Sequence, residues 1–190
     1  QQRQKKNCVG QPIWATDIDL LDEDGNPANP GELFSRSPFL FSGYLKNGKV
    51  EQSASHPSCG ISVGDIARRD EEGYYYIVDR KDDMVISGGV NIYPRQIEQV
   101  IDSHAQVLES AVIGIPDNRM GEKLTALLVE RSPSGPRLMM ELDALCRERL
   151  GPLKTPSRFA VVESLPRSGT GKILKSELRA SLSDDIATDR

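Results

Sequence analysis

The spacing of apolar residues changes once along the chain, close to Asp79, and this change restricts the possible folds more than any other feature. Before Asp79, short runs of β-branched and aromatic residues alternate with turn-forming residues, and no run has the spacing of an amphipathic helix. After Asp79, helical spacing and strand-like apolar runs alternate. We therefore expect two parts, a β-rich part over residues 1–79 and an α+β part over residues 80–190.

The first part is expected to be a barrel-like or sandwich-like arrangement of short strands. Turn signals separate these strands, and two of them, Asp24-Gly25 and Glu72-Gly73, are typical of hairpins. A polar stretch over residues 46–60, rich in Ser and Gly, predicts an exposed loop. The strands themselves are expected at residues 16–21, 32–35, 39–41, 65–68 and 74–78.

The second part is expected to be a small α+β domain in which helices flank a three-stranded sheet. Tyr93-Pro94 predicts the start of a helix, because proline is favoured in the first helical turn. A second helix is expected over residues 138–150, with Gly151 as its C-terminal cap. The residues expected on buried helix faces are Ile97, Val100, Ile101, Leu138, Leu142 and Leu145. Strands are expected at 109–115, 123–130 and 158–163, and a last helix at 173–182.

Charge and apolar content exclude two classes of protein. The 24 Lys and Arg residues are outnumbered by 28 Asp and Glu residues, so a globally basic nucleic-acid-binding protein is not expected. No apolar run approaches the roughly 18 residues that a membrane-spanning helix needs. The polar first residues do not resemble a signal peptide. These observations together predict a cytoplasmic protein without a transmembrane segment.

The cysteines and histidines predict neither a disulfide framework nor a metal site. Cys8, Cys59 and Cys146 are odd in number and far apart in the chain, so buried, inert thiols are expected. His56, Cys59 and His104 do not have the spacing of a recognised ligand cluster. We therefore expect no metal site in this chain.

A Gly-rich segment over residues 165–175 is the first that suggests chemistry. Two glycines precede Lys172, which predicts a mobile loop with a cation at its tip. The segment is not a Walker A loop, because Pro166 stands where that motif needs glycine and Ile173 where it needs Ser or Thr.

The surroundings of this segment are locally positive within an acidic chain. Four cations against Glu177 give a local charge of +3, which favours a phosphate or a carboxylate as the ligand. A solvated surface turn followed by exposed lysines remains the alternative, because short Gly/Lys patterns are common. The four cations are Arg167, Lys172, Lys175 and Arg179.

A second segment, residues 79–98, begins where the apolar spacing changes. Its four consecutive charged residues, 80–83, predict an exposed hinge between the two parts. Gly88-Gly89 follows a short expected strand, and the absence of side chains there allows a turn or the close passage of another group. An ordinary turn would explain a single Gly-Gly pair equally well.

Together these segments resemble the AMP-forming adenylating enzymes, the family that includes acyl-CoA synthetases, nonribosomal peptide adenylation domains and luciferases. The resemblance extends from about Gly10 to Arg179, with ordered motifs at family-like separations. Residues 79–94 are closer to acyl- and aryl-CoA ligases than to peptide-synthetase adenylation domains. The upstream motifs are Gly31-Glu-Leu, Gly43-Tyr44, Gly64-Asp65 and Glu72-Gly73-Tyr74.

The resemblance implies an ATP-dependent reaction in two half-reactions. A carboxylic acid and ATP give an acyl-adenylate and pyrophosphate, and the acyl group then passes to the thiol of CoA. The resemblance implies that Asp65 accepts hydrogen bonds from the ribose hydroxyls, while Arg80 and Asn91 bind other parts of ATP. Lys172 is the implied catalytic residue, reaching between the carboxylate and the α-phosphate and stabilising charge as the bond forms. Any Mg²⁺ is expected to arrive with the ATP.

The resemblance also implies that the small C-terminal domain rotates about a hinge at Asp82 between the half-reactions. Rotation withdraws Lys172 and brings a glycine-containing strand to the adenylate, where the absent side chains leave a channel for pantetheine. The residues implied to contact CoA are Gly88, Gly89, Val90, Arg119 and Lys154.

Two family motifs have no counterpart here, the Ser/Thr/Gly-rich phosphate loop and the Tyr-Gly-x-Thr-Glu motif. Both belong to the large N-terminal domain of the family, which also holds the acyl pocket. We therefore expect residues 1–79 to be the end of that large domain and residues 80–190 to be the C-terminal lid. The missing N-terminal domain is the expected partner, and the 190-residue chain is expected to be inactive in adenylation by itself.

Three functions remain open from the residues. The first is an acyl-CoA ligase for fatty or aryl acids, and the second an adenylating enzyme that loads a carrier-protein phosphopantetheine. The third is a non-catalytic lid that binds a nucleotide or a partner domain. Lys172 distinguishes the third from the others, since a non-catalytic module has no need of it.

Overall fold

The computed structural model describes residues 5, 7–41, 43–51, 55–56 and 60–188. The chain divides into two compact units, residues 1–82 (unit 1) and 83–190 (unit 2). This boundary lies three residues beyond the predicted one. Strand β7 (Tyr75–Arg80) continues past Asp79, and the next residue, Lys81, is bonded to Glu32 of unit 1.

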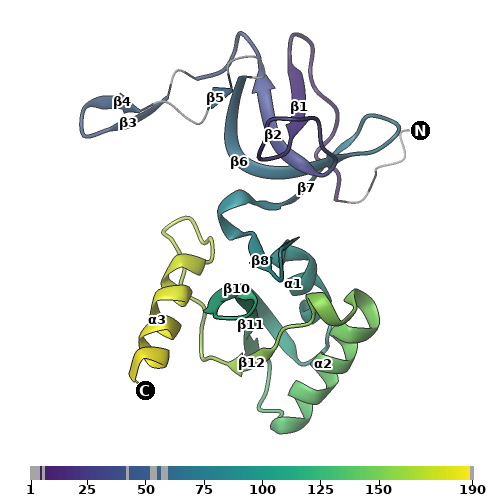
Figure 1. Cartoon of the computed structure of the whole chain (residues 1–190), viewed down its shortest axis with the longest axis vertical. Helices are drawn as coiled ribbons and strands as arrows, with labels where there is room; N and C mark the ends of the chain where they lie inside the picture. The colour runs from purple at the N-terminus through teal and green to yellow at the C-terminus, as the bar shows by residue number, and fades with distance from the viewer. Residues whose placement is uncertain (1–4, 6, 42, 52–54, 57–59, 189–190) are drawn as a thin grey trace. The chain divides into compact units, whose positions relative to one another are not determined.

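Unit 1 is organised around the long, curved strand β6 (Gly60–Arg69), as Figure 1 shows. All of its strand pairs are antiparallel: β6 pairs with β2 (Gly31–Arg36), β5 (Ser55–His56) and β7, and β2 also pairs with β1 (Asp17–Leu21). Among the described strands, the pairing stays open at β1 and does not close into a barrel. The buried apolar residues are Leu21, Phe34, Ile66, Ala67 and Tyr75.

Two predictions for unit 1 are wrong in detail. Residues 39–41 form no strand, because Pro38 has no N–H for a ladder and the Phe39 N–H instead bonds to the Ser37 hydroxyl. The stretch 46–60 is not simply a loop, since β3 (Tyr44–Lys46) and β4 (Lys49–Glu51) form a hairpin. Its turn is Asn47-Gly48, both with positive φ, which is the most favourable two-residue hairpin turn.

Unit 2 contains a five-stranded sheet, so the prediction of three strands is wrong in number although the α+β class is confirmed. The strand order is β10 (Val107–Asp117), β11 (Gly121–Glu130), β8 (Val85–Ser87) and β9 (Val90–Ile92). The fifth strand, β12 (Arg158–Val161), runs parallel to β11. Strand β8 corresponds to the short strand expected before Gly88-Gly89, and it forms a hairpin with β9. The hairpin joins β11 through the Gly121–Ser87 pair and through hydrogen bonds from Ile86 and Ser87 to Glu122.

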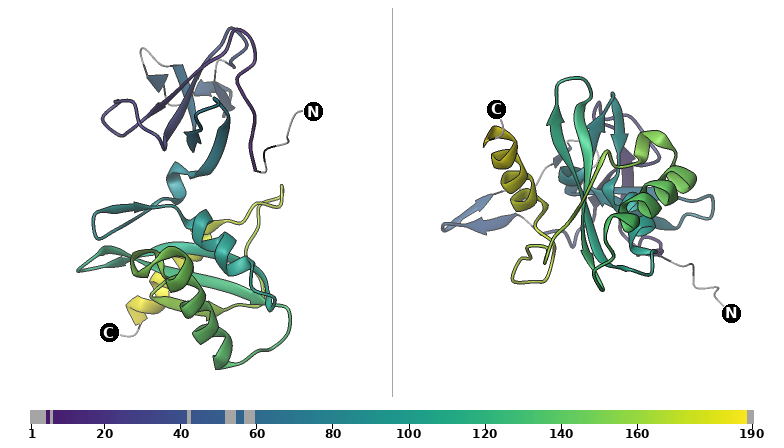
Figure 2. Two further views of the ribbon diagram at one scale, coloured as in Figure 1. Left: turned by 90° about the vertical axis from the view of Figure 1, so that its right-hand side faces the viewer. Right: turned by 90° about the horizontal axis from the view of Figure 1, so that it is seen from below.

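Helices cover both faces of this sheet (Figure 2). Helices α1 (Pro94–Asp102) and α2 (Pro136–Leu150) pack against one face, and α3 (Lys175–Thr188) packs against the other. Successive residues of β10 alternate between the two cores, with Val112 facing α1 and α2 and Ile113 facing α3. Because both faces are buried, β10 and β11 have nearly continuous apolar sequences.

The predicted helix faces are largely confirmed. Ile97 and Ile101 are fully buried, and Val100 packs against the same core. On α2 the buried positions are Leu138, Leu142 and Cys146, one turn apart, whereas the predicted Leu145 is only half-buried. Gly151 ends this helix with φ of 78°, as its role as a cap predicts.

Burial determines the chemistry of the one cysteine in this core. Desolvation raises the pKa of the Cys146 thiol to about 11, so the reactive thiolate is scarce at neutral pH. Cys8 is also free and is half-buried, while Cys59 falls outside the described residues. Among the helices described, none has both the length and the apolar character needed to cross a membrane.

Candidate functional site

Lys172 lies on a hairpin-like loop over residues 166–174 that is closed by backbone hydrogen bonds. The Leu174 N–H donates to the Pro166 carbonyl at 2.8 Å, and the Ser168 N–H donates to the Lys172 carbonyl at 2.8 Å. Gly171 sits in the turn with φ of 83°. The sequence predicts a mobile loop, whereas in the structure these hydrogen bonds join the two sides of the loop to each other.

The cations around this loop are not equally available. The Arg167 guanidinium is bonded to Glu109, and Arg179 lies 3.7 Å from the Asp83 carboxylate. Within the described part of the chain, the exposed Lys172 ammonium has no hydrogen-bond or ion-pair partner. Carboxylates from other parts of the fold therefore neutralise much of the predicted local charge of +3. Of the four cations around the loop, Lys172 is the one that remains available to a ligand.

The predicted CoA glycines form the turn of the β8–β9 hairpin. Gly88 and Gly89 have φ of 59° and 77°, as a two-residue type I′ turn requires. A Cβ added at Gly89 would meet no atom within 4 Å, so the space beside this turn is open. Val90 and Asn91 follow on β9, and both are exposed.

The turn between β10 and β11 supports this hairpin. The Gly88 N–H donates to the Met120 carbonyl at 2.9 Å, and a Cβ at Gly88 would lie 2.8 Å from the Met120 methyl group. Arg119 is in the same turn and is exposed. Asp117 holds the turn by accepting hydrogen bonds from the backbone N–H groups of Arg119 and Met120.

This turn is expected to weaken in acid. The ion pair with Lys123, followed by the two backbone hydrogen bonds, lowers the pKa of Asp117 from 3.8 to about 2. A folded-state pKa below the unfolded value contributes stability above pH 3.8, and that stability is lost as the pH falls through about 2. A carboxyl NMR titration should show a midpoint near 2 for Asp117; a midpoint near 4 would contradict the assignment. Asp117→Asn should reduce the difference in denaturation midpoint between pH 7 and pH 3.

Asp65 and Arg80, both predicted to bind ATP, are paired in unit 1. They face each other across the β6–β7 ladder, and the Arg80 Nη1 donates to the Asp65 Oδ1 at 2.8 Å. The second carboxylate oxygen of Asp65 has no partner among the described residues, and half of the Arg80 side chain is exposed. Both groups therefore keep hydrogen-bonding capacity.

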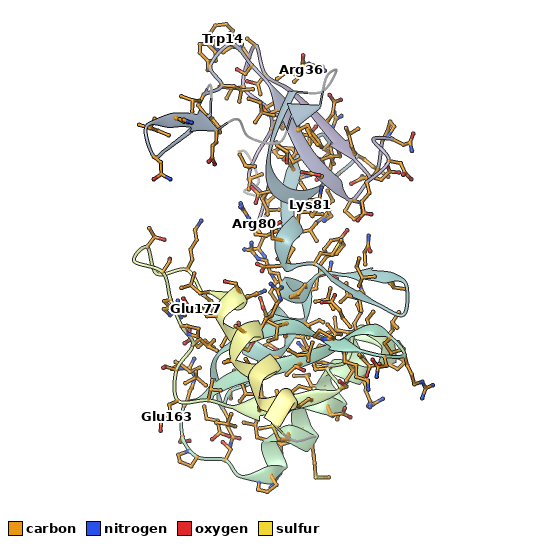
Figure 3. The ribbon with its side chains drawn as sticks, turned by 60° about the vertical axis from the view of Figure 1, so that its left-hand side comes forward. Trp14, Arg36, Arg80, Lys81, Glu163 and Glu177 are labelled. Atoms are coloured by element: carbon orange, nitrogen blue, oxygen red, sulfur yellow. The ribbon has the colours of Figure 1, made fainter. Side chains whose placement is uncertain are left out.

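The residues on either side of the predicted hinge are each anchored within their own unit. Lys81 donates to the Glu32 carboxylate at 2.7 Å in unit 1, and this hydrogen bond raises the pKa of Lys81. Figure 3 marks Arg80 and Lys81 where β7 ends. Asp83 lies beside Arg179 and Lys175 in unit 2. Asp82, between these anchors, is exposed and is the last residue of unit 1.

Lys154, the other predicted contact for CoA phosphates, is already engaged. It lies in the short helix Pro152–Lys154, is half-buried, and donates to the Gln96 side-chain oxygen at 3.1 Å. This hydrogen bond links the short helix to α1. An anion would have to compete with that bond, whereas Arg119 is exposed.

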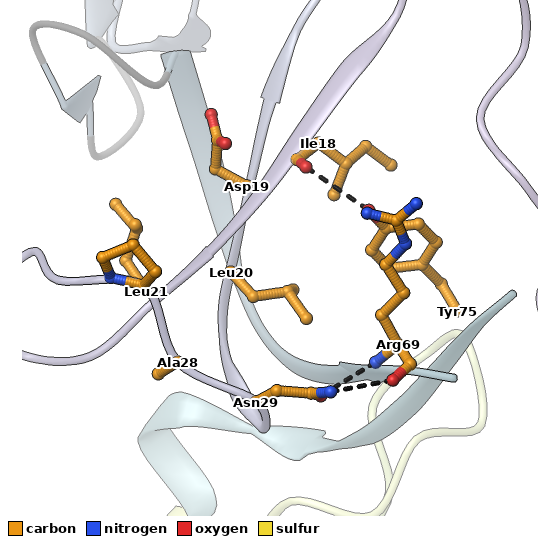
Figure 4. Close-up of a pocket in the computed structure, with 9 residues that line it drawn as sticks. Ile18, Asp19, Leu20, Leu21, Ala28, Asn29, Arg69 and Tyr75 are labelled. Carbon is orange, nitrogen blue, oxygen red and sulfur yellow. Dashed lines mark hydrogen bonds between the residues drawn. The ribbon is translucent and has the colours of Figure 1, made fainter. Parts of the chain in front are cut away.

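Unit 1 also contains a pocket of about 370 Å³, shown in Figure 4. Arg69 lies beside Tyr75, whose hydroxyl donates to the Ile18 carbonyl, and Asn29 exchanges two hydrogen bonds with the Arg69 backbone. None of the residues singled out in the sequence lines this pocket. The candidate site is therefore defined by exposed loops and not by this cavity.

Sequence reasoning missed the partnership of Glu98 and Lys175, whose side chains meet at 2.7 Å. Lys175 is only 9% exposed, whereas the sequence predicts it to be one of four cations available to a ligand. One signal was present: Lys175, Leu178 and Leu182 have helical spacing, which places the lysine on the apolar face of α3. The acceptor could not be found this way, because Glu98 is 77 positions away in the chain.

The expected absence of a metal site stays a prediction. His104 lies 3.4 Å from the Glu141 carboxylate, whereas the His56 side chain and Cys59 are outside what the structure describes. In the described ranges, no three His, Cys, Asp or Glu side chains are grouped as ligands for a metal ion.

Comparison with known proteins shows what the second unit is similar to. Residues 96–172, which include most of α1 and Lys172, match the family model of the AMP-binding enzyme C-terminal domain. Unit 2 thus resembles this domain over most of its length. Over 180 residues, 90% of this chain, the sequence is 38% identical to the medium/long-chain-fatty-acid–CoA ligase of Mycobacterium tuberculosis and covers 31% of that protein. The resemblance inferred from the sequence is thereby confirmed.

Solved structures share the fold of both units. The o-succinylbenzoate CoA synthetase from Bacillus subtilis, solved with an acyl-adenylate intermediate, matches 92% of this chain with 34% identity and a TM-score of 0.80. The amide bond synthetase from Marinactinospora thermotolerans matches 92% with 32% identity and a TM-score of 0.79. The chain covers 36% of each of these proteins. It therefore spans about a third of the relatives that it matches.

Proposed function

We propose that this chain is the C-terminal portion of an ATP-dependent, AMP-forming acyl-CoA ligase. In this proposal a fatty or aryl carboxylic acid is converted to an acyl-adenylate, and the acyl group is then transferred to CoA. The matches to acid–CoA ligases support the reaction class. Residues 1–82 would complete the large domain of the enzyme, and unit 2 would act as its lid.

The observation that carries the proposal is Lys172, an exposed ammonium on a braced loop whose neighbouring cations are paired with carboxylates. When a carboxylate attacks the α-phosphate, negative charge builds up on the phosphoryl oxygens and on the departing pyrophosphate in the transition state. A cation already held in position stabilises that charge with little reorganisation. We assign Lys172 this catalytic role in adenylation.

We assign the remaining nucleotide contacts to three groups. The free oxygen of Asp65 suits a ribose hydroxyl, and the exposed Arg80 guanidinium suits the ribose and phosphate region. The exposed amide of Asn91, on β9, is proposed to face ATP. Mg²⁺ would enter as part of the nucleotide substrate.

We assign the CoA contacts to the β8–β9 hairpin. The open space beside Gly89 and the absence of side chains at the turn suit a narrow pantetheine chain. Val90 would line the same channel, and the exposed Arg119 would meet a CoA phosphate. Lys154 is the weaker candidate, because its ammonium is bonded to Gln96.

The hinge proposal predicts a selective effect of Asp82→Pro in the full-length enzyme. Anchors at Lys81 and Asp83 leave Asp82 as the residue that absorbs the backbone rotation, and proline fixes φ near −65°. We expect thioester formation to fall on the order of a hundredfold, with adenylation changed much less. Pyrophosphate exchange and the transfer of a supplied acyl-adenylate to CoA measure the two steps. Equal losses in both would refute the hinge.

The proposed activity is tested by acid-dependent ATP–pyrophosphate exchange in the full-length enzyme, followed by mass spectrometry of the acyl product. Acyl-CoA is the expected product. Acyl-carrier protein would favour the loading enzyme, and an amide product would place the chain with the amide bond synthetase to which it is also similar. Nucleotide binding without exchange would favour a non-catalytic lid. The 190-residue chain itself is expected to show no exchange.

We place this reaction in the cytoplasm, where ATP and CoA are available and free thiols such as Cys146 stay reduced. The proposed partners are the acid substrate, ATP, CoA and the large N-terminal domain. The acidic composition argues against nucleic acid as a partner.

A further inference from the structure

Lys175 is the most buried of the four cations around the Lys172 loop. It is the first residue of α3, is 9% exposed, and donates to the Glu98 carboxylate at 2.7 Å. Lysine is rarely buried in this way unless it is paired, because removing a charge from water is unfavourable. The Lys175 ammonium is therefore held in place and is not available to a substrate.

Its partner Glu98 joins three elements of unit 2. The Glu98 side chain lies on α1 and is 15% exposed, and its Oε1 also accepts the backbone N–H of Val112 on β10 at 2.8 Å. One turn after Lys175 on α3, Arg179 lies 3.7 Å from the Asp83 carboxylate at the start of the unit. The beginning of α3 is thus fixed to both α1 and strand β10.

The fixed start of α3 is also the base of the Lys172 loop. The residue before Lys175, Leu174, closes that loop through its bond to Pro166. On the same loop, the Arg167 guanidinium donates to the Gly171 carbonyl at 2.7 Å, next to Lys172. Because these hydrogen bonds join the two sides of the loop, we expect a displacement of its base to move its tip.

We propose that Lys175 is a positioning residue for adenylation. Held by Glu98, it fixes the base of the 166–174 loop and so holds the Lys172 ammonium where charge develops. This inference rests on the proposed function, in which Lys172 is the catalytic cation. Lys175 itself does not contact the substrate, and its effect passes entirely through Lys172.

The test is a double-mutant cycle in the full-length enzyme, with Lys175→Met, Lys172→Ala and the double variant. We expect Lys175→Met to lower kcat for pyrophosphate exchange on the order of tenfold to a hundredfold, with the KM for ATP changed less than about twofold. In the Lys172→Ala background the same substitution should have no further effect. Transfer of supplied acyl-adenylate to CoA should stay within about twofold. Lys175→Arg should recover part of the rate, because a guanidinium can still donate to Glu98.

Two controls separate positioning from folding. Arg147→Gln breaks an exposed ion pair with Asp143 on α2, away from the loop, and should leave both half-reactions unchanged. Protection of the buried Cys146 thiol from alkylation reports that unit 2 is folded. If Lys175→Met does not fold, Glu98→Gln replaces it, because the amide oxygen can still accept the Val112 N–H.

Each failure has a distinct signature. The positioning role would be overturned if Lys175→Met lowered the exchange rate by the same factor in the Lys172→Ala background as in the wild-type enzyme. It would also be overturned if Lys175→Met lowered the rates of both half-reactions equally. Wild-type exchange in Lys175→Met, with Lys172→Ala inactive, would overturn it as well and leave the proposed function intact. Wild-type exchange in Lys172→Ala itself would overturn the catalytic role proposed for Lys172, and with it this inference. Absence of exchange in the unaltered full-length enzyme is the result that would overturn the proposed reaction.

Discussion

Replacing Lys172 with alanine in the full-length enzyme should lower the rate of acyl-adenylate formation by about a hundredfold to a thousandfold. The ammonium is exposed on a braced loop, and within the described residues no carboxylate neutralises it. Its removal therefore takes away charge stabilisation in the transition state without leaving a buried group unpaired. ATP–pyrophosphate exchange measures the loss directly.

The second half-reaction gives the internal comparison for this variant. Transfer from a supplied acyl-adenylate to CoA should be nearly unchanged, since Lys172 is proposed to act only while the acyl–phosphate bond forms. Arg137→Ala, which removes another exposed cation of unit 2 from helix α2, should leave exchange at the wild-type rate. A Lys172→Ala enzyme that adenylates normally would exclude the catalytic assignment and favour a lid without catalysis.

Replacing Leu142 with alanine should lower the free energy of unfolding of unit 2 by about 2–5 kcal/mol. Leu142 is fully buried in the core that α1 and α2 form with one face of the sheet. The substitution removes buried apolar surface and leaves a cavity that the surrounding side chains fill only in part. Alkylation of Cys146 at increasing denaturant, followed by peptide mass mapping, measures the opening of this core.

Met140 supplies the matched control on the same helix. Met140 is 75% exposed, so Met140→Ala removes few contacts and should change the free energy of unfolding by no more than about 0.5 kcal/mol. Similar midpoints for the two variants would show that Leu142 does not lie in the packed core. A decrease in the free energy of unfolding for Leu142→Ala alone would agree with the alternation of buried and exposed positions along α2.

The helices and the loop with Lys172 were predictable because their signals are local. Pro94 and Gly151 mark a helix start and a helix end through backbone preferences that depend on adjacent residues. The Gly88-Gly89 turn was similarly recognisable, since both positions need positive φ. The Asn47-Gly48 turn carried an equally local signal but was placed in an exposed loop.

Other features depend on partners far away in the chain and had no local signal. The attachment of the β8–β9 hairpin to the sheet rests on the pairing of Ser87 with Gly121. The support of Gly88 by Met120 likewise joins two separate turns. Such contacts depend on how the elements pack, and no preference of a single segment specifies them.

The sequence by itself determined that the chain has two parts, that the second is an α+β domain, and that the segment with Lys172 resembles one of the AMP-forming adenylating enzymes. Only the tertiary structure decided which cations remain available. Arg167, Lys175 and Arg179 look equivalent to Lys172 in the sequence, but the fold brings carboxylates from Glu109, Glu98 and Asp83 to those three. The physical reason is that the charge of a residue is set by its type, whereas its neutralisation is set by neighbours that only folding brings within a few ångströms.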